Sequence, residues 1–311
     1  MKAVLPALAR PLIEAELPPD LDISWFTSRQ EAEDMVRDAE IAWVDQEPAA
    51  LAGEVALKGE RLRWLSTMHA GLDAFPLRQL HRRGVTVTNG SGLNAITVSE
   101  YAVMGMLVAA KRFDEVVRLA DRHEWSKAAP GRLELAGSSA LIVGYGTIGR
   151  LIGARLSAFD VAVTAVTRSG RDGTLTPDQW RDRLGDFDWV VLAAPSTGET
   201  KAMIGAAELA AMKPSAWLVN IARGDMIDNP ALIAALKAGD IAGAFLDTVH
   251  PEPLPADDPL WSAPNTIHSM HLSGRSQTTM VPRAARLFLK NLAAYRAGQP
   301  LTNVVDLDAG Y

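Results

Sequence analysis

Four polar side chains that can do acid, base or anion-binding chemistry lie in the second half of the sequence. Arg223, Asp247, Glu252 and His271 each follow a short apolar segment rich in residues typical of buried β-strands. In open α/β sheets, the side chains beyond the carboxyl ends of the strands gather around the ligand. We therefore expect these four residues to converge, although the chain separates them widely.

The residue types match the reduction of a 2-oxo acid. His271 can give a proton near neutral pH, and a nearby Glu252 would stabilise its imidazolium form. Arg223 can hold a carboxylate and polarise a carbonyl oxygen, and no metal is required. His250 and His268 are alternative acid/base candidates. Taken singly, each residue also suits a structural role, so only the joint pattern favours chemistry.

A glycine-rich turn predicts a dinucleotide site. The segment Leu141–Gly149 places a G-x-G-x-x-G pattern between a strand-like run and a helical stretch. The glycines allow a tight turn, a close approach of backbone N–H groups to a pyrophosphate, and close packing of helix on strand. The predicted phosphate contacts are Gly144, Gly146, Thr147, Ile148 and Gly149.

A basic turn follows the next apolar segment, where NAD sites usually carry an Asp or Glu for the ribose 2′-OH. Thr167 stands at that position, and Arg168, Ser169 and Arg171 come soon after it. Arginines and hydroxyls bind a 2′-phosphate by charge-assisted hydrogen bonds, whereas a carboxylate repels it. We predict NADP(H) as the preferred cofactor and NAD(H) as the second choice. The alternative is that these arginines are ordinary solvated loop charges.

The elements that must position these residues form an alternating pattern. Runs of Val, Ile and Leu alternate with helix-like segments, which is typical of parallel sheets with crossover helices. The sequence predicts the α/β class with two doubly wound parallel-sheet domains, a Rossmann cofactor domain and a smaller flavodoxin-like substrate domain. A long helix is expected over 94–121 and another over 277–297. Strands are expected at 2–5, 23–26, 41–44, 63–67 and 85–88, then at 139–143, 161–166, 189–193, 216–221, 243–247 and 266–268.

The composition limits the partners. The 311 residues carry a formal net charge of -6 without a long basic run, which argues against nucleic acid or an anionic membrane surface. There is no cysteine, so thiolate catalysis and disulfides are excluded. The longest apolar run, Tyr101–Ala110, is about half of the ~20 residues that cross a bilayer. We expect a cytoplasmic protein that acts on a small molecule.

Several motifs in one order give the sequence a family resemblance that covers nearly the whole chain. It resembles the D-2-hydroxyacid dehydrogenases, which include hydroxypyruvate and glyoxylate reductases. The motifs are the glycine turn, Val190–Thr200, Leu218–Gly224, Gly243–Pro255 and His268–Gly274.

The resemblance implies a role for each polar residue of these motifs. Arg223 anchors the substrate, Glu252 is the acidic partner and His271 is the acid/base. The cofactor contacts include Pro195, Thr200 and Asp247, of which Asp247 is expected to bind the nicotinamide amide.

Two positions near the predicted acid/base distinguish this chain within the family. Glu252 separates it from the formate dehydrogenase branch, which carries Gln there. Met270 stands where the family usually has Pro, directly before His271. The backbone around the predicted acid/base is therefore expected to differ.

The segment Ser66–Asp73 resembles the substrate loop of the family. The resemblance implies that backbone N–H groups of Ala70 and Gly71 receive the substrate carboxylate. His69 is an unusual residue there, with either a contact to the distal end of the substrate or a packing role.

The resemblance also implies a discontinuous domain arrangement. Residues 1–93 and 275–311 would form the substrate domain, and residues 94–274 the cofactor domain. Closure of the two domains would exclude water from the reacting atoms. A homodimer through the cofactor domain is expected.

Two alternatives stay open. A nucleotide-sensing co-repressor would bind NAD(P)H without turnover, and a phosphite dehydrogenase would use a similar Arg, Glu and His set.

Overall fold

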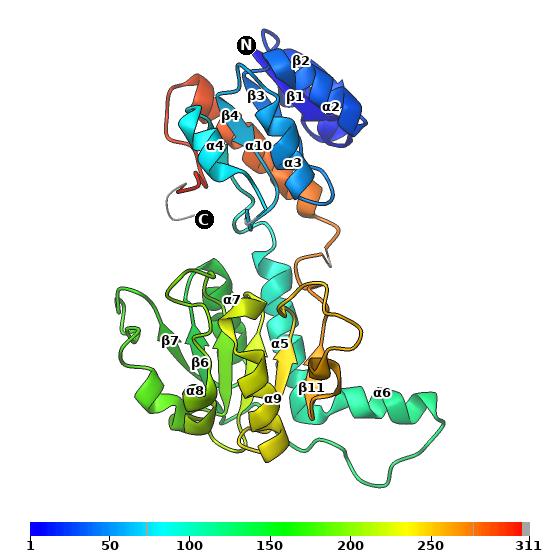
Figure 1. Cartoon of the computed structure of the whole chain (residues 1–311), viewed down its shortest axis with the longest axis vertical. Helices are drawn as coiled ribbons and strands as arrows, with labels where there is room; N and C mark the ends of the chain where they lie inside the picture. Colours follow the sequence, from blue (N-terminus) through cyan, green and yellow to red (C-terminus); the bar gives the residue numbers. More distant parts are fainter. Residues whose placement is uncertain (73, 276, 307–311) are drawn as a thin grey trace. The chain divides into compact units, whose positions relative to one another are not determined.

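The structure is a computed structural model that describes residues 1–72, 74–275 and 277–306. The chain divides into two compact units, shown in Figure 1. Unit 1 comprises Met1–Asn94 and Gln277–Tyr311, and unit 2 comprises Ala95–Ser276. Within the described residues, no helix has the length and apolar character needed to span a bilayer.

Unit 1 is built on a five-stranded parallel sheet with the strand order β2-β1-β3-β4-β5. This is the order of flavodoxin-like domains, which confirms the predicted class for this unit. The strands are β1 (Lys2–Pro6), β2 (Asp22–Phe26), β3 (Ile41–Trp43), β4 (Trp64–Ser66) and β5 (Thr86–Thr88).

Alternate side chains of the unit 1 strands are buried on opposite faces of the sheet, so each face has its own apolar core. On one face, Phe288 stacks on Trp43 and Trp64 with ring centroids 5.5 and 5.2 Å apart. The helix that carries Phe288 therefore completes the apolar core on this face of the unit 1 sheet. The helices are α1 (Arg10–Ile13), α2 (Arg29–Met35), α3 (Ala50–Leu57), α4 (Leu77–Arg82) and α10 (Met280–Arg296).

Unit 2 is built on a six-stranded parallel sheet with the order β11-β10-β9-β8-β6-β7. The chain runs outward from β6 in both directions, which creates the switch point where such sheets bind nucleotides. The predicted doubly wound class is confirmed here too. The strands are β6 (Ser139–Val143), β7 (Ala162–Val166), β8 (Trp189–Leu192), β9 (Trp217–Asn220), β10 (Gly243–Leu246) and β11 (Thr266–His268).

Helices cover both faces of the unit 2 sheet, and each face buries an apolar cluster. Gly105 of one helix lets the ring of Phe245 approach, because an added Cβ would lie 2.5 Å from a ring carbon. The helices are α5 (Ala95–Lys111), α6 (Phe113–Asp121), α7 (Thr147–Ser157), α8 (Ala206–Ala211) and α9 (Asn229–Ala238).

The single helix predicted over 94–121 is wrong, because the structure has α5 and α6 there. Arg112, between them, has a left-handed backbone with φ 47°. Its guanidinium pairs with Asp114 and Glu115 of the second helix, which stabilises the break. As a result α6 extends away from the sheet of unit 2 (Figure 1).

Candidate active site

His271 and Glu252 form an ion pair beyond the carboxyl ends of β11 and β10. Nδ1 of His271 lies 2.6 Å from Oε2 of Glu252, a distance typical of a strong charge-assisted hydrogen bond. The other carboxylate oxygen, Oε1, accepts the backbone N–H of Val249 at 3.0 Å. Glu252 is thus held through both oxygens, and Nε2 of His271 is the ring nitrogen that this pair leaves for proton transfer.

The pKa of Glu252 lies below its ordinary value. Partial burial raises this pKa, but the hydrogen bond with His271, the Val249 amide and the charges of His271 and Arg223 lower it further than burial raises it. Glu252 is therefore ionised at neutral pH, as the partner of a proton-carrying imidazole needs to be.

The turn that carries Arg223 packs against the loop of this ion pair. Asn220, buried at the end of β9, donates from Nδ2 to the carbonyl oxygen of Arg223 at 2.9 Å. Gly224 is required, because an added Cβ would lie 1.9 Å from the carbonyl carbon of Val249. The charge of Arg223 also contributes to the lowered pKa of Glu252.

Asp247 is buried directly after β10 and is surrounded by the loop that carries His271. Its carboxylate accepts the hydroxyl of Ser269 at 2.6 Å and the N–H of Leu272 at 3.1 Å. It also accepts the hydroxyl of Ser273. The predicted contact of Asp247 with a nicotinamide amide stays a prediction.

The glycine turn has the geometry of an anion site. Gly144 has φ 98°, and an added Cβ would lie 2.4 Å from a backbone nitrogen of the loop after β8, so only glycine fits. Gly146 is the N-cap of α7 and caps it with no side chain, and a Cβ added there would meet nothing within 4 Å. The N–H groups at Thr147 and Ile148 therefore lie at an uncapped, positive helix end, which fits a dinucleotide pyrophosphate.

The turn after β7 carries the predicted ribose contacts, and Thr167 is held within it. Oγ1 of Thr167 lies 2.7 Å from Oγ1 of Thr174 and accepts the N–H of Gly170 at 3.1 Å. The same short turn carries Arg168, Ser169 and Arg171. Since β7 pairs with β6, this turn lies on the strand next to the glycine turn.

The predicted residues of unit 2 lie along one edge of its sheet. Pro195 and Thr200 share a turn in which Oγ1 of Thr200 donates to the carbonyl oxygen of Pro195 at 2.8 Å. In sheet order, His271 follows β11, Asp247 and Glu252 follow β10, Arg223 follows β9, Pro195 and Thr200 follow β8, the glycine turn follows β6, and Thr167 follows β7. The acid/base candidates therefore lie at one end of the row, and the phosphate and ribose candidates at the other.

His268, an alternative acid/base candidate, contacts Leu260 and Trp261. Its Nε2 lies 3.2 Å from the carbonyl oxygen of Leu260, and its ring packs on Trp261 at a centroid distance of 4.9 Å. Burial lowers the pKa of His268. The histidine paired with the carboxylate of Glu252 is His271.

The predicted substrate loop follows β4 in unit 1, and a buried carboxylate holds it. Asp45 accepts the N–H of Met68 at 2.8 Å, Nε1 of Trp43 at 2.7 Å and the hydroxyl of Thr67. Nε2 of His69 is buried 3.7 Å from Oδ1 of Asp45 and has no hydrogen-bond partner within the described residues. Burial raises the pKa of Asp45.

A second anchor fixes the backbone of the same loop. Nδ2 of Asn89 donates to the carbonyl oxygen of Ala70 at 3.0 Å, and the N–H of Gly90 donates to that of His69 at 2.9 Å. Asp73, the last residue of the predicted motif, lies outside the described residues.

Comparison with known proteins decides the family. Residues 103–273 match the family described as D-isomer specific 2-hydroxyacid dehydrogenase, NAD binding domain. The chain belongs to the D-isomer specific 2-hydroxyacid dehydrogenase family. The resemblance is confirmed, and this dehydrogenase is an NAD(P)-dependent oxidoreductase of 2-hydroxy acids.

Relatives of the dehydrogenase include two named reductases. The glyoxylate reductase of Korarchaeum cryptofilum is 32% identical over 81% of this chain and 79% of that protein. The glyoxylate/hydroxypyruvate reductase B of Pectobacterium atrosepticum is 32% identical over 79% of each chain. A family protein of Aeromonas salmonicida has a similar crystal structure, with a TM-score of 0.87, 29% identity and 99% of each chain covered.

The sequence analysis did not single out Asn220 or Asp45, the residues that anchor the Arg223 turn and the predicted substrate loop of the dehydrogenase. Asn220 stands inside a family motif, but its role depends on a turn that only the structure defines. Asp45 comes two residues after the end of β3, and Asp247 comes directly after β10. The signal used for the second half of the chain, a polar residue soon after a buried strand, would have found it.

Proposed function

We propose that this dehydrogenase reduces a small 2-oxo acid of the glyoxylate and hydroxypyruvate class to the 2-hydroxy acid, with (R) configuration where the product is chiral, and with NADPH as the preferred cofactor. The observation that carries this proposal is the His271–Glu252 pair beside the Arg223 turn. The two relatives named for glyoxylate or hydroxypyruvate reduction support the substrate class.

In this proposal Arg223 binds the substrate carboxylate and carbonyl oxygen, so its charge faces the oxygen on which negative charge develops. A nicotinamide cofactor, when bound, would supply the hydride needed at the α carbon. Nε2 of His271 donates the proton that completes the hydroxyl group. Glu252 holds Nδ1 and balances the positive charge of the ring. In the reverse direction, the neutral ring takes the proton back.

The cofactor preference follows from the turn after β7. Thr167 replaces the carboxylate that NAD sites use for the ribose, and Arg168 and Arg171 bring positive charge to the same turn. We propose that these residues and Ser169 bind the 2′-phosphate of NADPH. NADH is the weaker cofactor in this proposal.

The substrate loop supplies uncharged donors. We propose that the N–H groups of Ala70 and Gly71 receive the substrate carboxylate, because the loop backbone is anchored by Asp45 and Asn89. His69 presents only part of its ring to a ligand, since its Nε2 faces Asp45.

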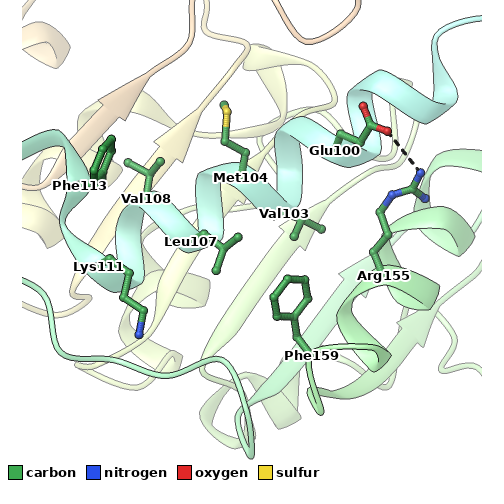
Figure 2. A pocket seen from close by; sticks show the side chains of 9 residues that line it. All are labelled: Glu100, Val103, Met104, Leu107, Val108, Lys111, Phe113, Arg155 and Phe159. Carbon is green, nitrogen blue, oxygen red and sulfur yellow. Dashed lines mark ion pairs between the residues drawn. The ribbon is translucent and has the colours of Figure 1, made fainter. Parts of the chain in front are cut away.

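We propose that the dehydrogenase is a homodimer through unit 2, and an apolar hollow on that unit supports the proposal. The hollow measures about 490 Å³ and lies between α5, the start of α6 and the end of α7 (Figure 2). Met104, Phe113 and Phe159 are 42, 55 and 41% exposed there, although such side chains are usually buried. The Glu100–Arg155 ion pair, at 3.8 Å, lies at the rim.

The dimer is tested by sedimentation velocity. Phe113→Asp is expected to give monomers with unchanged circular dichroism, because a charge in an apolar interface opposes association. Leu8→Asp, at an apolar side chain 68% exposed in unit 1, is the matched control. A monomeric wild type would contradict the proposal. The cytoplasmic location and the lack of a nucleic-acid partner stay predictions.

The function is tested by NADPH oxidation with glyoxylate, hydroxypyruvate, pyruvate, phenylpyruvate and branched 2-oxo acids. We expect the highest kcat/KM for glyoxylate or hydroxypyruvate. His271→Gln should nearly abolish turnover and preserve NADPH binding. Binding of NADPH without turnover of any 2-oxo acid would indicate the sensor alternative, and phosphite-dependent reduction of NADP would indicate the phosphite enzyme.

A further inference from the structure

His69 belongs to a polar cluster of unit 1 that the proton transfer at His271 does not use. Its side chain is 16% exposed and that of Asp45 is 6% exposed, and Nε2 of His69 lies 3.7 Å from Oδ1 of Asp45. The ring also packs on Phe75, at a centroid distance of 6.0 Å. Within the described residues, neither His69 nor Asp45 forms an ion pair with any other group. The two side chains are therefore each other's electrostatic partners.

The backbone of His69 is fixed on both sides. Its N–H donates to Oγ1 of Thr67 at 3.1 Å, and its carbonyl oxygen accepts the N–H of Gly90 at 2.9 Å. The hydroxyl of Thr67 donates in turn to Asp45, which also accepts the N–H of Met68 at 2.8 Å. The carboxylate and the loop backbone therefore form one hydrogen-bonded network, which fixes the start of the His69 side chain.

The position of Nε2 decides which ring nitrogen of His69 can meet a ligand. Nε2 is buried and has no hydrogen-bond partner within the described residues, and such a nitrogen is costly unless it faces an opposite charge. Burial raises the pKa of Asp45, and the charge of His69 counteracts that rise. A proton on Nε2 faces this carboxylate favourably, whereas a lone pair there would be repelled. We therefore place a proton on Nε2, which leaves Nδ1 for a ligand.

Nδ1 of His69 belongs next to the N–H groups that are proposed to bind the substrate carboxylate. Only Cβ and Cγ separate Nδ1 from its own backbone, and Ala70 and Gly71 are the next two residues. A neutral ring with its proton on Nε2 would present a lone pair to a carboxylate. A doubly protonated ring presents a positively charged N–H, whose hydrogen bond is about twice as strong as a neutral one. An anion bound at this loop therefore favours the protonated ring.

We propose that His69 is a third, charged donor of the carboxylate subsite in unit 1: Asp45 holds Nε2, and Nδ1–H binds the same substrate carboxylate as the N–H groups of Ala70 and Gly71. The inference rests on the proposed function, in which this loop receives the carboxylate. It replaces both roles that the sequence left open for His69, a contact with the distal end of the substrate and packing. The ligand class is a small carboxylate, so His69 contributes to the binding of every 2-oxo acid.

The first test compares two substitutions of His69. Asparagine places its NH₂ group near the position of Nδ1 and glutamine near that of Nε2, so only asparagine keeps a donor for the carboxylate. We expect the Kd for oxamate, an unreactive analogue of a 2-oxo acid, to rise about tenfold in His69→Gln and less in His69→Asn. The Kd for NADPH should not change. His81→Gln, at an exposed histidine of α4, is the control. An unchanged Kd for oxamate in His69→Gln would overturn the proposal.

A comparison of substrates separates carboxylate binding from a distal contact. Glyoxylate, pyruvate and hydroxypyruvate share the carboxylate and differ at the other end. His69→Gln should raise KM for all three by a similar factor. A rise confined to hydroxypyruvate would overturn the proposal and assign His69 to the distal end. A lower unfolding temperature with unchanged KM values would overturn it in favour of packing.

A spectroscopic readout needs neither turnover nor a folded His69 variant. It uses His271→Gln with ¹⁵N-labelled histidine, so that the ring of His271 does not contribute, and the ring of His69 is assigned by its contact with Phe75. In the complex with NADPH and oxamate, both ring nitrogens of His69 should give the signals of protonated nitrogens. An unprotonated Nδ1 in this complex would overturn the proposal.

The two proposals can fail separately. If oxamate gives the expected Kd values and nitrogen signals but no 2-oxo acid is turned over, the proposed function fails alone. If 2-oxo acids are turned over and His69→Gln leaves every KM unchanged, the role of His69 fails alone.

Discussion

Nδ1 of His271 lies 2.6 Å from Oε2 of Glu252, so one ring nitrogen is committed to the carboxylate. Glu252→Gln keeps the shape but removes the charge. We expect kcat for 2-oxo acid reduction to fall about 100-fold, because the protonated ring loses its counter-charge. Glu134→Gln, at an exposed site, is the control.

The lowered pKa of Glu252 also predicts a pH dependence of stability. Because the fold favours the carboxylate, its contribution to stability is present above the ordinary value of 4.5 and is lost as the pH falls through the lowered pKa. The thermal unfolding temperatures of wild type and Glu252→Gln should differ at neutral pH and converge in acid. A difference that persists unchanged in acid would contradict this prediction.

Thr167→Asp should reverse the cofactor preference. A carboxylate at this position repels a 2′-phosphate and accepts from a ribose 2′-OH. The ratio of kcat/KM for NADPH to that for NADH is expected to fall at least about tenfold. The control Ser215→Asp adds the same charge just before the amino end of β9, away from the carboxyl ends of the strands. It should leave the ratio unchanged. An unaltered ratio in Thr167→Asp would mean that the 2′-phosphate of NADPH does not bind beside Thr167.

Gly224→Ala should disturb the Arg223 turn. The added Cβ would lie 1.9 Å from the carbonyl carbon of Val249, and backbone cannot yield as a flexible side chain does. We expect kcat/KM for the 2-oxo acid to fall about 100-fold while the Kd for NADPH is preserved. In the control Gly185→Ala, the nearest atom would be at 3.4 Å, an ordinary contact. Steady-state kinetics near wild type for Gly224→Ala would rule out this packing.

Asp45→Asn should affect substrate binding more than chemistry. In wild type, the Asp45 carboxylate accepts hydrogen bonds from Trp43, Thr67 and Met68. The asparagine NH₂ group cannot accept any of them. We expect KM for the 2-oxo acid to rise about tenfold, the cost of one or two hydrogen bonds, with NADPH binding unchanged. Asp22→Asn, at an exposed residue of β2, is the control. An unchanged KM would remove the loop from substrate binding.

Phe288→Ala should lower the free energy of unfolding by about 3–5 kcal/mol, because it leaves a cavity between two tryptophans. Phe288 is 1% exposed and stacks on Trp43 and Trp64. Urea unfolding followed by circular dichroism measures the change. Leu8→Ala, at a side chain 68% exposed, should change stability by less than about 0.5 kcal/mol. Equal midpoints for the two variants would contradict the packing role.

Local patterns determined much of this protein. Buried parallel strands need apolar runs, so the strands of unit 1 could be predicted to within a residue at each end. The glycine turn could be predicted because positive φ at Gly144 and the close approach at Gly149 admit no other residue. The candidate residues Arg223, Glu252 and His271 could be named because each follows a strand of one sheet.

Contacts between distant segments decided the features that the sequence did not predict. The break at Arg112 depends on side-chain pairs that hold a left-handed residue, and helix-forming composition on both sides gave no sign of it. The turn at Met270 and His271 depends on Asp247, more than 20 residues earlier in the chain. The sequence by itself determined which residues are available for chemistry and which strands carry them. Only the tertiary structure decided which acid pairs with which histidine, because side-chain direction depends on hydrogen bonds from elements far apart in the chain.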